Sequence, residues 1–210
     1  VSDIRMPGES GLIFLSKVKD KFPEIPIIIM TAYSDLDTAV DAARDAFINY
    51  SKSSKEDRLN ILERIISSYK KRMNDLSNAV TIEMGAPKTL SEKAQVPSGL
   101  GHFMQAKKIL ENFRFEKEVN SSIVQKEPVG VCGLITPWNW PINQVNLKVI
   151  PALASACTVI LKPSEIAPLS SMLLAEMIDE VKFPPGVFNL VNGDLSLIHI
   201  SEPTRRRGIS

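Results

Sequence analysis

The strongest constraint on the fold is an alternation of short apolar strands and helices in the second half of the chain. The sequence predicts strands over residues 129–135, 158–161 and 187–191, with helices over 142–156 and 169–180. Strands separated by helices of this length indicate a parallel sheet, because a parallel partner is reached only through a long crossover. We therefore expect an α/β fold with a Rossmann-like sheet and helical crossovers.

Two polar segments follow the first two of these strands. Residues 136–139 read Thr-Pro-Trp-Asn, and residues 162–165 read Lys-Pro-Ser-Glu. In open parallel sheets, ligands bind outside the carboxyl ends of the strands. The order of residues alone thus predicts that these two segments form a binding edge.

The first half of the chain carries apolar residues at helical spacing and predicts helices in front of the sheet. The longest such stripe runs over residues 59–80 as one continuous helix, and Ser53 with Glu56 indicates a capping box at its start. A further helix is expected over 103–113. Residues 121–126 then alternate in the way that a strand does.

Composition excludes several classes of partner. Lys and Arg number 25 against 24 Asp and Glu, so the net charge of +1 gives no basic field for nucleic acid. The most apolar stretch, 153–161, is far shorter than the roughly 20 residues that a membrane helix needs. We expect a protein without nucleic-acid or membrane partners.

The thiol and imidazole groups are few. Cys132 and Cys157 are the only cysteines, and His102 and His199 the only histidines, so we expect neither a disulfide framework nor a Cys/His metal site. This composition fits a reducing, cytoplasmic setting.

Two motifs resemble those of the aldehyde dehydrogenase superfamily. The first is Gly-Leu-Ile-Thr-Pro-Trp-Asn-Trp-Pro over residues 133–141, followed by Lys148, and the second is Leu-Lys-Pro-Ser-Glu over 161–165. They occur in the family's order and at its spacing, and the resemblance covers about residues 36–194. The flanking stretches that agree with the family are 54–59, 83–87 and 185–189.

The resemblance implies an incomplete aldehyde dehydrogenase fold. Members oxidise an aldehyde to a carboxylic acid by thiol attack and hydride transfer to NAD or NADP, and they form homo-oligomers. The family's nucleophilic cysteine, general-base glutamate and glycine-containing cofactor turn belong to motifs that would follow residues 191–194. We therefore expect a fragment without catalytic activity.

The resemblance assigns catalytic roles to Asn139 and Lys148. In the family, the Asn139 amide helps to hold the carbonyl oxygen that becomes an oxyanion, and one such donor contributes roughly 3 kcal/mol to lowering the barrier. Spacing alone favours an asparagine that tolerates a turn. Lys148 matches a lysine that some relatives use in a proton relay, whereas a helix-surface lysine is its more ordinary interpretation.

The resemblance also implies a cofactor cleft. Lys162 and Glu165 match residues that contact the adenosine ribose, and the carboxylate would favour NAD because it repels the 2′-phosphate of NADP. The alternative interpretation is a solvated Lys and Glu pair at a strand end. The remaining residues expected to line the cleft are Ile135, Thr136, Pro137, Trp138, Asn139 and Ser164.

Neither cysteine is expected to be the nucleophile. Cys132 lies inside the strand predicted over 129–135, and Cys157 lies at the edge of the next strand. Apolar surroundings bury a thiol and raise its pKa, which opposes formation of the reactive thiolate.

The first segment resembles a bacterial response-regulator receiver domain. Residues 2–8 read Ser-Asp-Ile-Arg-Met-Pro-Gly, with a strand, a helix and a second strand expected up to Thr31. The resemblance implies that Asp3 is a phosphoacceptor and that Thr31 senses the phosphoryl group. It covers only residues 1–37, without the acidic pair that holds Mg²⁺ or the lysine of the last strand. A phosphorelay protein is therefore the alternative function.

The end of the chain follows neither family. Residues 195–210 resemble translated sequencing-adapter sequence and are expected to be non-native, although their three arginines leave a weak basic patch as the alternative. The two family resemblances meet near residues 34–40. We expect a receiver segment over 1–37 and a cofactor-binding region over 38–194, with a chimeric reading frame of no function as the third possibility.

Overall fold

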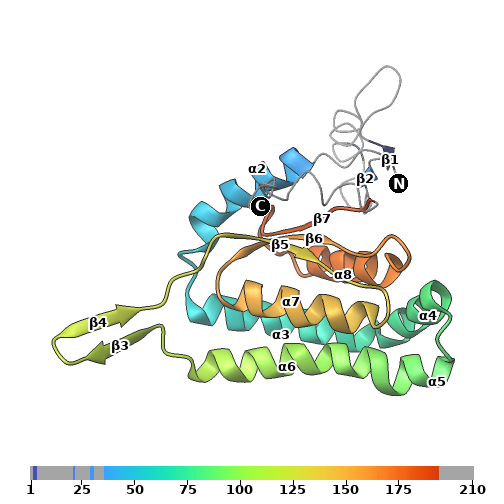
Figure 1. Cartoon of the computed structure of the whole chain (residues 1–210), viewed down its shortest axis with the longest axis horizontal. Helices are drawn as coiled ribbons and strands as arrows, with labels where there is room; N and C mark the ends of the chain where they lie inside the picture. Colours follow the sequence, from blue (N-terminus) through green and yellow to red (C-terminus); the bar gives the residue numbers. More distant parts are fainter. Residues whose placement is uncertain (1, 4–20, 22–28, 31–35, 194–210) are drawn as a thin grey trace, which may run out of the picture. The chain divides into compact units, whose positions relative to one another are not determined.

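The computed structural model of the chain divides into two compact units (Figure 1). The larger unit comprises residues 37–191, and the smaller combines residues 1–36 with 192–210. The residues that the structure describes are 2–3, 21, 29–30 and 36–193.

Among the described residues of the smaller unit, two short strands pair in parallel. In β1 (Ser2–Asp3) and β2 (Ile29–Met30), Ser2 pairs with Ile29 and Asp3 with Met30. A parallel pair agrees with the strand, helix and strand predicted here. The predicted helix between them, Thr31 and the tail 195–210 lie outside the described residues.

The helical part of the larger unit precedes its sheet, as the sequence predicts. In the long helices, apolar side chains recur on one face, and that face packs into the core. In chain order they are α2 (Leu36–Tyr50), α3 (Lys55–Lys71), α4 (Met73–Met84), α5 (Lys88–Leu90), the π-helix η1 (Ser91–Gln95) and α6 (Val96–Asn112).

The capping box of α3 lies one residue later than predicted. Ser54 Oγ accepts a hydrogen bond from the Asp57 backbone N–H at 3.0 Å, and Asp57 Oδ2 accepts from the Ser54 N–H at 3.3 Å. The predicted pair of Ser53 and Glu56 is wrong. Arg58 donates to the carbonyl and hydroxyl oxygens of Ser53, which keeps Ser53 outside the helix.

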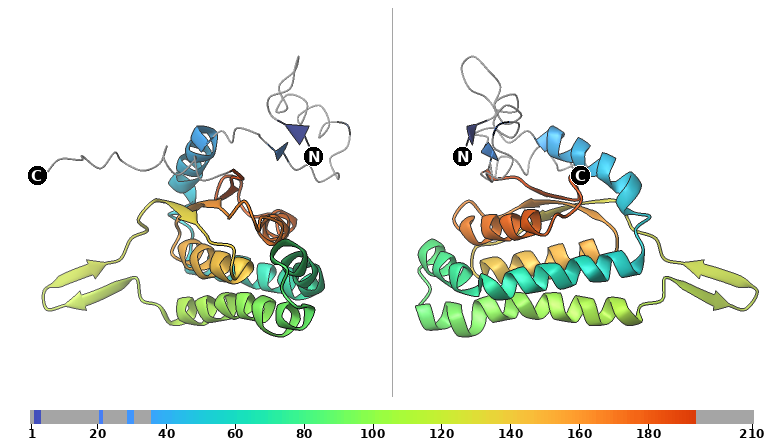
Figure 2. Two further views of the ribbon diagram at one scale, coloured as in Figure 1. Left: turned by 45° about the vertical axis from the view of Figure 1, so that its right-hand side comes forward. Right: turned by 180° about the vertical axis from the view of Figure 1, so that it is seen from behind.

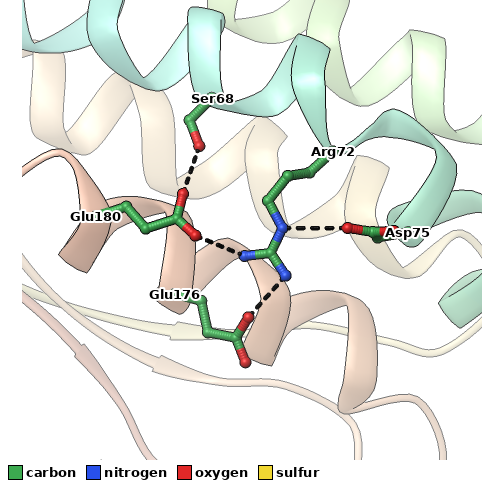
Figure 3. Close-up of polar contacts among 5 residues, drawn as sticks. All are labelled: Ser68, Arg72, Asp75, Glu176 and Glu180. Atoms are coloured by element: carbon green, nitrogen blue, oxygen red, sulfur yellow. Dashed lines mark hydrogen bonds and ion pairs between the residues drawn. The ribbon is translucent and has the colours of Figure 1, made fainter. Parts of the chain in front are cut away.

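The single helix predicted over 59–80 is also wrong, because it breaks at Arg72. There the backbone turns out of helical geometry, at φ −104° and ψ 15°. The Arg72 guanidinium reaches the Glu176 carboxylate at 2.8 Å and the Glu180 carboxylate at 3.1 Å (Figure 3). The second piece, α4, ends at Gly85, whose φ of 69° is the left-handed conformation typical of a helix end.

The sequence did not predict the π-helix before α6 or the first strand of the hairpin after it. The helix predicted over 103–113 begins at Val96, directly after the π-turn of η1. The strand predicted over 121–126 belongs to a hairpin of β3 (Glu116–Val119) and β4 (Ser122–Gln125) that extends away from the helices (Figures 1 and 2). All eight strand residues are exposed, so β3 carries no apolar pattern that would reveal it.

The alternating second half forms the predicted parallel sheet. Its strands β5 (Val131–Ile135), β6 (Thr158–Lys162) and β7 (Phe188–Leu190) pair in parallel in the order β5, β6, β7. The crossovers are α7 (Pro141–Ala154) and α8 (Leu169–Glu180). The central strand β6 is buried along its whole length, which explains its continuous apolar run.

Helix α7 joins the sheet to the helical layer. It and α3 lie between the sheet and α6 (Figures 1 and 2). The close contact of α6 with α3 and α7 depends on Gly99, because an added Cβ there would lie 2.5 Å from the Tyr69 hydroxyl of α3 and 3.0 Å from the Asn146 amide nitrogen of α7. That hydroxyl donates to the carbonyl of Val96 at 2.9 Å, and the Asn146 amide donates to the carbonyl of Gly99 at 3.2 Å.

Candidate functional site

The two polar segments lie side by side at the carboxyl ends of β5 and β6 (Figure 1). Ile135 pairs with Lys162 in the sheet, and the Thr136 backbone N–H donates to the carbonyl of Lys162 at 3.2 Å. Because parallel strands end at the same edge, residues far apart in sequence meet there. The juxtaposition predicted from the sequence is therefore present.

An ion pair stands at the end of the central strand. Lys162 Nζ lies 3.3 Å from Glu165 Oε2 and donates to the carbonyl of Pro163 at 3.2 Å. The Lys162 side chain is 9% exposed and that of Glu165 is 41% exposed. The lysine is thus held in place by packing, while the carboxylate is partly exposed to solvent.

Ser164 shapes the turn between these two residues. Its hydroxyl accepts a hydrogen bond from the Ile166 N–H at 3.3 Å, and its carbonyl accepts from the Ala167 N–H at 3.2 Å. The structure therefore gives Ser164 a local role in orienting Lys162 and Glu165.

The segment after β5 combines a buried hydroxyl with exposed apolar surface. Thr136 is buried, and within the described part of the chain its Oγ1 has no hydrogen-bond partner. Pro137 is exposed, and Ile135 and Trp138 keep 42% and 47% of their surface in solvent.

Asn139 is exposed just before α7 begins at Pro141. No hydrogen bond to another described residue engages its side-chain amide, which leaves the N–H groups available for an oxygen atom. The first turn of α7 is fixed to α6 by Asn143, whose amide lies 2.9 Å from Ser98 Oγ and 3.0 Å from His102 Nε2. Sequence reasoning missed this anchor, since no periodicity marks which polar residues of two helices will meet.

Lys148 lies on the exposed side of α7 and reaches back to the sheet. Its ammonium donates a hydrogen bond to the carbonyl of Ile135, the last residue of β5. The contact places a positive charge at the candidate edge and ties α7 to the strand. A part in proton transfer stays a prediction.

The two cysteines lie away from this edge. Cys132 is near the start of β5, and Cys157 immediately precedes β6. Burial, reinforced by the neighbouring Cys157, raises the pKa of the Cys132 thiol to about 11. The raised pKa agrees with the expectation for Cys132, because a neutral thiol is a poor nucleophile.

Metal ligands do not gather in the described residues. Nowhere among them do three His, Cys, Asp or Glu side chains come together in a way that would hold a metal ion. None of the helices in the same residues has both the length and the apolar character needed to cross a bilayer.

The sequence model of the aldehyde dehydrogenase family matches residues 27–200. Two relatives illustrate the similarity. The 3-succinoylsemialdehyde-pyridine dehydrogenase of a Pseudomonas species is 51% identical over 171 residues, 81% of this chain and 36% of that protein. A putative aldehyde dehydrogenase of Staphylococcus haemolyticus is 45% identical over 161 residues, 77% of this chain and 34% of that protein.

Solved structures show the same likeness. A mutant of aldehyde dehydrogenase C from Pseudomonas syringae, complexed with NAD⁺ and octanal, matches with a TM-score of 0.77 and 43% identity over 79% of this chain and 34% of that one. Betaine aldehyde dehydrogenase from Staphylococcus aureus, in complex with NAD⁺, matches with a TM-score of 0.75 and 32% identity over 80% and 35%. This chain thus spans about a third of the length of the proteins it matches.

Proposed function

The chain belongs to the aldehyde dehydrogenase family, and on that premise we propose that it forms part of the cofactor cleft of an NAD(P)-dependent enzyme that oxidises aldehydes to carboxylic acids. The observation that carries the proposal is the meeting of 136–139 with 162–165 at one sheet edge. An amide donor and an ion pair are held there beside exposed apolar side chains.

The residues at this edge fit the adenosine ribose of a nicotinamide cofactor. The half-exposed Glu165 carboxylate would accept hydrogen bonds from ribose hydroxyls, and the packed Lys162 ammonium would donate to them. A carboxylate at this position favours NAD⁺ over NADP⁺, because it repels a 2′-phosphate. When bound, the cofactor supplies the acceptor for the hydride of the aldehyde.

Asn139 would act on the aldehyde carbonyl. Its exposed amide precedes a helix whose first turn is anchored through Asn143, so the donor starts from a fixed backbone. A preorganised donor stabilises the negative charge that develops on the oxygen, and losing one typically costs about 10²–10³ in kcat. Lys148 would stay close to this edge as an anchor of α7.

We propose that the chain alone does not turn over aldehydes. It spans about a third of its relatives, and the nucleophile and general base are proposed to belong to the remaining two thirds. Cys132 and Cys157 lie away from the edge that carries Asn139. A donor for an oxyanion gives no rate without the thiol that creates the charge.

Calorimetric titration with NAD⁺ tests the cofactor assignment. We expect a Kd in the millimolar range, about −4 kcal/mol of binding free energy, because these residues contact only one portion of the cofactor. Glu165→Gln should weaken NAD⁺ binding and should reduce the ratio of NAD⁺ affinity to NADP⁺ affinity. Glu118→Gln in the exposed hairpin is the matched control, and equal loss of binding in both variants would contradict the assignment.

A second candidate function, in phosphorelay, rests on the parallel pairing of β1 with β2. In this pair Asp3 and Met30 are register partners. The family match starts at residue 27 and gives this interpretation no support. We expect no phosphorylation of Asp3 by acetyl phosphate, because residues 1–37 lack the acidic pair that would hold Mg²⁺, the ion that offsets the phosphoryl charge. A Mg²⁺-dependent adduct in mass spectrometry that Asp3→Asn abolishes would establish the second function.

A further inference from the structure

A cavity of about 530 Å³ lies at the amino ends of β5 and β6, opposite to the candidate cofactor site. Residues 127–128, which precede β5, and residues 155–156, which precede β6, form part of its lining. The two strands are each five residues long, so about 16 Å of strand separates this cavity from Thr136. It is therefore distinct from the proposed cofactor cleft.

The cavity carries an excess of positive charge. Within the part of the chain that the structure describes, none of its basic side chains is in an ion pair. Lys55 Nζ instead donates to the backbone carbonyl of Glu111 at 3.1 Å, and Lys126 Nζ lies 4.6 Å from the centre of the Phe113 ring. The lining has four cations and one carboxylate, a net of +3: Lys52, Lys55, Arg58, Lys126 and Glu127.

Arg58 is the most buried of these cations, with 5% of its surface exposed. Its Nη1 donates to the carbonyl and hydroxyl of Ser53, and its guanidinium lies 5.2 Å from the centre of the Phe115 ring. Its Nε is shielded from solvent and has no acceptor among the described residues. Nη2 likewise makes no hydrogen bond to them.

Nη2 is the guanidinium nitrogen that can donate to an anion in the cavity, because the shielded Nε leaves no room for an oxygen atom. An oxyanion there would give Nη2 the acceptor that the described residues do not provide. The amino end of α3 is not needed for the argument, because Ser54 and Asp57 already cap it.

We propose that this cavity binds a small phosphate monoester, with a phosphoryl oxygen accepting a hydrogen bond from Nη2 of Arg58 and with Lys52 and Lys126 offsetting the charge. The net charge of the lining suits a dianion. The volume lies within the range of small-molecule sites and exceeds what a lone phosphate fills. Phe47 and Phe115 supply apolar surface for the organic group of the ester.

Titration of the ¹⁵N-labelled chain by NMR at constant ionic strength tests the proposal. Inorganic phosphate should shift the amides of 51–58 and 125–128 saturably, with a Kd of about 1–10 mM. Phenyl phosphate should bind more tightly, because its ring meets the apolar surface. Formate should bind more weakly than either, because it carries one negative charge.

Substitutions of the lining residues test whether phosphate binds in this cavity. Arg58→Lys keeps the charge but loses the Nη2 donor and its fixed direction, and should weaken phosphate binding by about tenfold or more. The double variant Lys52→Gln/Lys126→Gln should weaken it by about threefold or more, and it tests the site even if Arg58→Lys fails to fold. Lys88→Gln, on a remote surface, should bind as the unmodified chain does.

Several outcomes would overturn the assignment. Absence of saturable shifts, or equal shifts with chloride, would show that there is no oxyanion site. Formate binding at least as tightly as phosphate would exclude a phosphate ester as the ligand class. Unchanged affinity in the double variant would mean that the anion binds elsewhere. Cofactor binding at the other end of the strands should not respond to any of these variants.

Discussion

Arg72 joins the break between α3 and α4 to α8, and replacing it with Met should destabilise the larger unit (Figure 3). Its guanidinium lies 2.8 Å from Glu176, 3.1 Å from Glu180 and 3.3 Å from Asp75. Glu180 also accepts a hydrogen bond from the Ser68 hydroxyl at 3.0 Å, which helps to hold this carboxylate in position for the arginine. Arg72→Met keeps much of the packed stem and removes the charge.

The exposure of each partner sets the magnitude. The carboxylates of Glu180 and Asp75 are 53% and 58% exposed, so each contact is screened by solvent; we assign each about 0.5 kcal/mol. Glu176 is 34% exposed and its contact is the shortest, which supports about 1 kcal/mol. The sum is about 2 kcal/mol of unfolding free energy, or roughly 4–8 °C in Tm for a chain of this size.

Urea unfolding followed by fluorescence of Trp138 and Trp140 measures the loss. Arg64→Met is the matched control, because Arg64 is exposed on the same helix. The effect of Arg72→Met should shrink in 0.5 M salt, where partly exposed charges are screened. Equal effects of the two variants, or a loss that salt does not change, would refute the electrostatic account of the break.

Three further predictions concern packing, pH and the tail. Gly99→Ala should destabilise the chain by about 1–3 kcal/mol, because its Cβ would lie 2.5 Å from the Tyr69 hydroxyl, whereas Gly101→Ala meets nothing within 4 Å and should be neutral or stabilising in urea unfolding. Burial raises the pKa of Glu83, so the folded state binds its proton more tightly than the unfolded state does. The free energy of unfolding should therefore fall as pH rises from the ordinary pKa of a glutamate to the raised pKa of Glu83. Urea unfolding measured across this pH range should show that fall for the unmodified chain and not for Glu83→Gln. Deleting residues 195–210 should leave the Tm unchanged, and a fall of several degrees in calorimetry would show that the segment is packed.

The sheet and its binding edge were predictable because their signals are local. Continuous apolar runs mark β5 and β6, and the residues directly after them must lie at the carboxyl edge of a parallel sheet. That rule is enough to predict that Asn139 and Lys162 lie at the same edge of the sheet. The roles of these residues stay proposals, because geometry shows where the groups lie and not what they bind.

The features that were missed depend on contacts that apolar periodicity does not reveal, and one of these contacts joins distant segments. The apolar stripe of 59–80 continues through Arg72, and the break arises where that side chain meets α8, about a hundred residues later. Ser53 and Ser54 both stand three residues before an acid, so the sequence does not distinguish the two caps; in the structure Ser54 caps α3, and Arg58 binds Ser53. The strand β3 is charged and exposed, and it exists because β4 pairs with it.

The central claim is that this chain carries part of an aldehyde dehydrogenase cleft without the nucleophile. Absorbance of NADH at steady state, with propanal or a bulkier aldehyde and saturating NAD⁺, tests it most directly. We predict a rate equal to the blank without protein for the unmodified chain, for Cys132→Ser and for Cys157→Ser. Turnover by the unmodified chain that either serine variant abolishes would contradict the claim, because it would identify as nucleophile a cysteine that lies away from the proposed site.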